Sequence, residues 1–134
     1  MTVRTGRVEL TPAAEELLRE LTGTHGPVMF HQSGGCCDGS APMCYPRGEF
    51  RVGASDVLLG HLAGDTPFWM SADQYAYWSH THLTVDVVPG RGSGFSLEAP
   101  ESVRFLLRSR LLTDEELRRL ESEPPLPNGA DHTR

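Results

Sequence analysis

Apolar residues recur with a helical period near the start of the chain. The stripe consists of Ala14, Leu17, Leu18 and Leu21. Positions i, i+3, i+4 and i+7 lie on one face of a helix, so this stripe is expected to face a core. Thr11 suits the N-cap of that helix, Pro12 suits its first position, and Gly26 ends it.

The middle of the chain has the shorter apolar runs and the alternation that indicate strands. The predicted strands cover residues 28–31, 49–52, 56–62, 68–70 and 80–88. A short helix over 71–78 is expected to begin at an S-x-x-Q capping box formed by Ser71 and Gln74. The glycines of 90–94 predict a tight turn, with 95–98 as the hairpin partner of 80–88.

Helices are predicted for the last third of the chain. One begins at Pro100 and carries Val103, Leu106 and Leu107, and a second follows the capping box of Thr113 and Glu116. We therefore expect one globular domain over 1–122 and a disordered proline-rich tail over 123–134. The predicted class is α+β, with a small, mostly antiparallel β-core flanked by N-terminal and C-terminal helices.

Length and charge narrow the class of protein. The 134 residues suffice for one domain with one core, and the formal net charge of −6 disfavours a protein that binds nucleic acid through its phosphates. No apolar run approaches the roughly 20 residues that span a bilayer, and the N-terminal residues lack the apolar stretch of a signal peptide. The expected location is the cytoplasm, with no membrane partner.

Three cysteines lie within nine positions of a glycine-rich segment: Cys36, Cys37 and Cys44. An odd, clustered count does not suit a secreted disulfide scaffold, and adjacent cysteines rarely form a disulfide with each other. Thiolates are the ligands that zinc, iron–sulfur clusters and copper(I) prefer, and nearby backbone amides lower a thiol pKa. The alternative is that these cysteines are small buried apolar side chains.

Histidines could complete a metal site. His80 and His82 lie two positions apart, so both rings project from the same face of an extended strand. His31 ends the strand that leads into the cysteine segment. Zinc or iron is therefore the expected metal. The predicted ligand set is Cys36, Cys37, Cys44, His80, His82 and His31.

Two stretches of sequence carry a family resemblance. Residues 31–40 read HQSGGCCDGS and continue through MCYP at 43–46, and residues 90–98 read GRGSGFSLE. They resemble the small bacterial family known as domain of unknown function 779, over nearly the whole chain up to Leu112. Members of that family are often encoded beside aldehyde or alcohol dehydrogenases, so the resemblance implies an accessory role toward such an enzyme.

A second resemblance concerns layout. A helix that opens with LTPAA at 10–14, then a strand, then Gly-Gly-Cys is similar to the start of the A-type iron–sulfur carriers of the HesB-like group. Their short helix, Asp-bearing strand, Gly-Ser-Gly-Phe turn and later proline have counterparts at 71–78, Asp86, 92–95 and Pro100. This resemblance implies a HesB-like fold.

The carriers' cysteine pattern is only partly present. Their first cysteine corresponds to Cys36, but Leu106 and Arg108 occupy the neighbourhood of their C-terminal Cys-x-Cys. An iron–sulfur cluster is therefore less favoured here than a zinc or iron ion.

The sequence thus predicts a small cytoplasmic metal-binding accessory protein, with a dehydrogenase as client, rather than a stand-alone enzyme. One alternative is a thiol-based redox enzyme or sensor, in which Cys36 or Cys37 attacks and Cys44 resolves. Another is a protein-interaction module whose cysteines are structural. The aromatic residues of 69–78 also indicate a homodimer.

Overall fold

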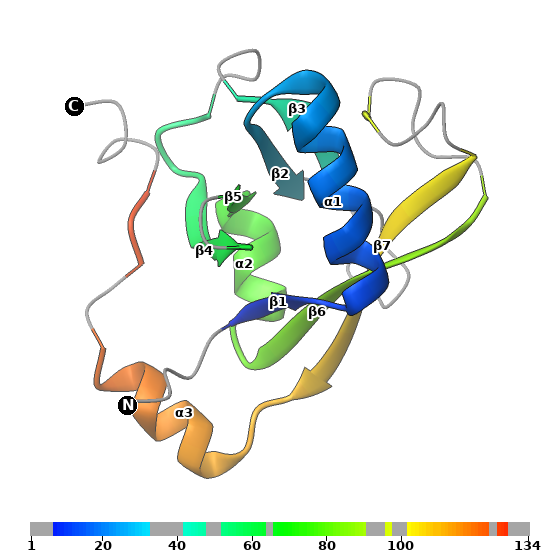
Figure 1. The fold of residues 1–134 in the computed structure, drawn as a ribbon. Coiled ribbons are helices and arrows are strands. Elements are labelled where there is room, and N and C mark those ends of the chain that lie inside the picture. The colour runs from blue at the N-terminus through cyan, green and yellow to red at the C-terminus, as the bar shows by residue number, and fades with distance from the viewer. Residues whose placement is uncertain are drawn as a thin grey trace.

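The computed structural model describes residues 7–32, 42–47, 52–63, 66–90, 96–97, 102–123 and 126–128. These residues form an α+β fold with two mixed sheets, which confirms the predicted class (Figure 1). The three-stranded sheet has the order β1 (Val8–Leu10), β6 (Thr81–Pro89) and β7 (Val103–Leu111). In this sheet β1 runs parallel to β6, and β6 runs antiparallel to β7.

The four-stranded sheet has the order β3 (Met43–Pro46), β2 (Val28–Gln32), β5 (Thr66–Met70) and β4 (Val57–Leu62). Its central strands β2 and β5 are parallel, and each edge strand pairs antiparallel with its neighbour. Every residue of β2 and of β5 is buried, as expected for strands that are covered on both faces.

Three helices lie within the described residues: α1 (Pro12–His25), α2 (Ala72–Trp78) and α3 (Asp114–Glu121). Their predicted caps are confirmed. The side chains of Thr11, Ser71 and Thr113 each accept a hydrogen bond from a backbone N–H of the first helical turn. Glu116 also closes the reciprocal half of the Thr113 capping box. None of these helices is long and apolar enough to cross a membrane.

The core lies where the two sheets and α1 meet. The buried residues Ala14, Leu18 and Leu21 of α1 belong to it, as the stripe predicted. Phe30 of β2 stacks on Phe68 with ring centroids 5.8 Å apart, so the core face of the four-stranded sheet carries both rings.

The helix predicted from Pro100 is wrong. Residues 103–111 form β7, which pairs with β6 along the whole length of both strands. Three consecutive apolar residues at 105–107 fit a helix or a strand, and pairing with a distant strand decides between them. β6 pairs with β7 and not with 95–98, the hairpin partner that was predicted, although residues 95 and 98 lie outside the described residues. Residues 49–51 of the predicted strand at 49–52 also lie outside them.

Part of the predicted tail is attached to the domain. The backbone N–H of Leu58 donates to the carbonyl of Pro127 at 2.9 Å, and Val57 forms a bridge with Asn128. Leu126 packs against the core. Residues 126–128 therefore lie along the outer edge of β4.

Candidate functional site

His31 and Asp56 form a buried pair beside the point where β2 ends. The His31 Nε2 atom lies 3.0 Å from Asp56 Oδ2, and the two side chains are 7% and 13% exposed. Asp56 lies immediately before β4, and its Oδ2 also accepts the backbone N–H of Gly53 at 2.9 Å. The Gly53–Asp56 turn thus holds a carboxylate in a fixed position against the imidazole.

Strand register places His31 on the far face of the four-stranded sheet, the face turned away from α1 and carrying Met29, His31, Tyr45 and Trp69. Met29, His31 and Trp69 are all buried there, and burial raises the pKa of the Tyr45 hydroxyl. Trp69 of β5 is the direct neighbour of His31 across the parallel pair. The His31 ring is therefore held in an apolar, water-poor setting, against the carboxylate of Asp56.

Cys44 lies on the opposite, core face of the same sheet. It is paired with Phe30 across β2 and β3, has no exposed surface and belongs to the hydrophobic core. Its backbone N–H donates to Ser96 Oγ at 2.8 Å, and its carbonyl accepts the N–H of Leu97 at 3.0 Å. The Cys44 side chain therefore lies in the core, on the opposite side of the sheet from the His31 ring.

His82 lies on the other sheet, on the face of β6 that alternates away from the core residues Leu83 and Val85. Its Nε2 atom is 3.8 Å from Glu9 Oε1. Burial lowers the pKa of His82, and the nearby Glu9 carboxylate only partly offsets this effect. His82 is therefore favoured in its neutral form.

His80 is exposed in the turn after α2. Its backbone carbonyl accepts the backbone N–H of Leu112 at 3.1 Å. His31 and Cys44 thus lie on opposite faces of the four-stranded sheet, and His82 lies on the other sheet. Within the described residues, no three His, Cys, Asp or Glu side chains gather into a group that could hold a metal ion. Cys36 and Cys37 lie outside the described residues.

Asp56 is the site residue that sequence reasoning missed. It follows a glycine-containing turn and is the first residue of the predicted strand at 56–62, and this position gives no sign of a functional role. Its partner His31 lies 25 positions earlier in the chain. The two meet because β4 and β2 both flank β5, and this order of strands is not readable from local patterns.

A family model described as a domain of unknown function, DUF779, matches residues 17–111. No curated protein matches the chain, and no solved structure does. The resemblance in layout to the A-type iron–sulfur carriers accordingly stays a prediction.

Proposed function

The chain belongs to the DUF779 family, and we propose that it is a small metal-binding accessory protein whose site lies at the end of β2. The observation that carries this proposal is the 3.0 Å contact between His31 and Asp56. A metal-ligating histidine almost always gives its second ring nitrogen to a carboxylate, a carbonyl or water, which fixes the ring and raises its basicity. Asp56 has the position and the chemistry for that supporting role.

The proposed ligands are His31, Cys36 and Cys37. In this proposal the imidazole of His31 supplies the nitrogen ligand, and Asp56 holds the ring in place. Cys36 and Cys37 follow His31 by only five and six positions, which limits their separation from it to about 20 Å at most, and the proposal brings both thiols to that ring. A mixed set of imidazole and thiolate suits zinc or iron, and the bound ion would supply a Lewis-acidic centre.

The other sequence candidates receive less support. Cys44 is sealed in the core, His80 is exposed in a turn, and His82 lies on the other sheet. The proposal therefore treats Cys44 as a structural residue. The proposed client remains an aldehyde or alcohol dehydrogenase in the cytoplasm.

Metal analysis of protein purified without chelator tests the proposal. We expect zinc or iron at close to one ion per chain in the parent. C36S, C37S and H31Q should each lose nearly all of the bound metal. D56N should weaken the metal affinity about 10–100-fold. The matched controls are H80Q and C44A, which should retain the metal. Substoichiometric metal in the parent, or equal metal content in all these variants, would remove the proposal.

The same His31–Asp56 pair favours one second candidate, a thiol enzyme or sensor. An imidazole oriented by a carboxylate also activates a cysteine nucleophile. In that case Cys36 or Cys37 would be alkylated much faster than Cys44 at neutral pH, and H31Q would slow that reaction. Cys44 suits the resolving role poorly, because a resolving sulfur must reach the attacking one and Cys44 has no exposed surface.

The third alternative is a protein-interaction module whose cysteines are structural. The Trp69 and Trp78 side chains that indicated a homodimer are both buried within the chain. Packing within one chain therefore explains the burial of both tryptophans, and they give the homodimer no further support. A module with structural cysteines would instead show serine variants that are less stable and still bind the client.

A further inference from the structure

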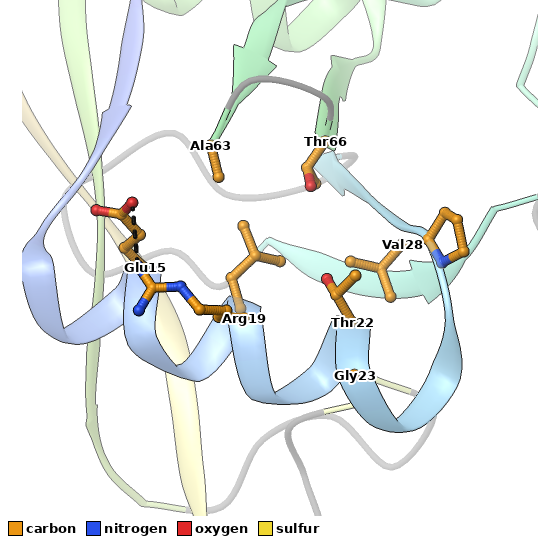
Figure 2. Close-up of a pocket in the computed structure, with 9 residues that line it drawn as sticks. Glu15, Arg19, Thr22, Gly23, Val28, Ala63 and Thr66 are labelled. Carbon is orange, nitrogen blue, oxygen red and sulfur yellow. Dashed lines mark hydrogen bonds and ion pairs between the residues drawn. The ribbon is translucent and has the colours of Figure 1, made fainter.

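A cavity of about 460 Å³ lies between α1 and the end of the β4–β5 pair. Figure 2 shows Thr22 and Gly23 on the helix and Val28 at the start of β2, with Ala63 and Thr66 facing them from the strand ends. The volume lies in the range of small-molecule sites, which is roughly 300–1,000 Å³. The cavity opens on the α1 side of the four-stranded sheet, so it is independent of the His31–Asp56 pair on the far face.

The interior of the cavity is apolar, with two hydroxyl groups. Leu18 and Val28 are core residues that form part of its wall, and Ala63 adds a methyl group. Thr22 and Thr66 supply the hydroxyls. This composition suits a short aliphatic chain, because apolar walls favour its transfer from water.

The entrance carries both signs of charge. Arg19 Nη2 lies 3.5 Å from Glu15 Oε1, one helical turn away, and the two side chains are 73% and 48% exposed. An exposed i,i+4 pair of this length contributes little to stability, so a ligand competes with it at small cost. A purely anionic head group would be repelled by Glu15, and a purely cationic one by Arg19.

We propose that this cavity binds a small aliphatic α-amino acid as its zwitterion. The ligand's carboxylate pairs with Arg19 and its ammonium group with Glu15. Its side chain lies against the apolar part of the lining, which includes Val28 and Ala63. A zwitterion is the head group that gains from both charges at once.

Two backbone features fit this site. Ala63 has a φ of +50°, a left-handed conformation that is unfavourable for a residue with a side chain and that recurs at ligand sites. A glycine inside a helix lowers the stability of that helix. At Gly23 no steric contact requires the glycine, because an added Cβ would meet nothing within 4 Å. The open space at Gly23 also offers a way to block the cavity without disturbing the fold.

NMR titration of the full chain with L-leucine tests the proposal. We expect the largest shifts at the amides and methyl groups of Leu18, Thr22 and Val28. Three probes of similar shape separate the possible head groups: 4-methylpentanoate lacks the ammonium, isopentylamine lacks the carboxylate, and isopentyl alcohol lacks both. Each should bind about tenfold or more weakly than leucine, since each loses at least one ionic contact.

Variants complete the test. R19Q and E15Q should each weaken leucine binding about tenfold. G23L fills space at the wall and should abolish binding, whereas G23A should keep it, and both should be at least as thermally stable as the parent. No shifts with leucine, shifts confined to other residues, equal binding of any truncated probe, or unchanged binding by R19Q would each overturn the proposal.

Discussion

The ring of Phe30 meets the ring of Phe105 edge-on, with centroids 4.9 Å apart and an interplanar angle of 89°. Phe30 belongs to the four-stranded sheet and Phe105 to the three-stranded sheet, so this contact joins the two sheets. Both residues are fully buried. Edge-to-face aromatic pairs stabilise a fold beyond the area that they bury.

We predict that F105A lowers the free energy of unfolding by about 3–5 kcal/mol, because it opens a cavity at the junction of the sheets. F105L should cost clearly less, since it retains most of the side-chain volume. Chemical denaturation of the two variants and the parent measures this difference. Equal stability of F105A and the parent would show that the sheets do not depend on this contact.

Asp86 links the start of α1 to both strands of the β6–β7 pair. Its Oδ2 accepts Arg108 Nε at 2.8 Å, and its Oδ1 accepts the hydroxyl of Thr11 at 2.9 Å. The hydrogen bond from Arg108 is the largest of the influences that hold the pKa of Asp86 below its ordinary value of 3.8.

This pKa shift predicts an acid-dependent loss of stability. The unfolded carboxylate takes up its proton at a higher pH than the folded one, so the contribution of Asp86 is complete above about pH 4 and is lost as the pH falls further. D86N should remove that contribution at neutral pH, at a cost on the order of 1 kcal/mol. Unfolding curves measured from about pH 2 to about pH 7 span the ordinary carboxyl range, and those of D86N and the parent should converge at the acid end. A constant gap would contradict the assignment.

His82 predicts a second pH dependence of the same direction at higher pH. Burial lowers the pKa of the folded imidazole below 6.5, so the unfolded chain binds this proton more readily. Stability should therefore fall as the pH drops through 6.5. H82Q should flatten this slope, and H80Q, at an exposed position, should leave it unchanged.

Glu116 closes the start of α3 and binds Arg110 through two contacts of 2.8 and 2.9 Å. The hydrogen bonds from Arg110 are the main reason that the pKa of Glu116 falls to about 2. NMR titration of the Glu116 carboxyl should place its midpoint near that value, and in R110Q the midpoint should move back toward 4.5. An unshifted midpoint in the parent would indicate that the bidentate pair does not persist in solution.

Local signals in the sequence predicted local structure well. The caps at Thr11, Ser71 and Thr113 depend on residues within one turn of each other, and all three are confirmed. Residues 103–107 form a strand because they pair with β6, which lies far away in the sequence, and the local pattern therefore predicts a helix there incorrectly. Apolar runs of this length do not distinguish the two by periodicity alone.

The candidate site was predictable only in part. His31 was recognised as a possible ligand from its place before the cysteine segment, but Asp56 was not, because strand order alone brings the two together. Cys44 carried the same sequence signal as Cys36 and Cys37, yet the register of β3 turns its side chain into the core. Which face of a strand is buried is a property of the whole sheet.

X-ray absorption at the metal edge of the zinc-loaded or iron-loaded protein reports directly which atoms bind the metal. A metal site at the end of β2 should give two sulfur ligands and at least one imidazole nitrogen, and for zinc these distances are about 2.3 and 2.0–2.1 Å. In H31Q the imidazole contribution should disappear, whereas in H80Q it should persist. A first shell without sulfur, or an imidazole signal unaffected by H31Q, would contradict a metal site at the end of β2.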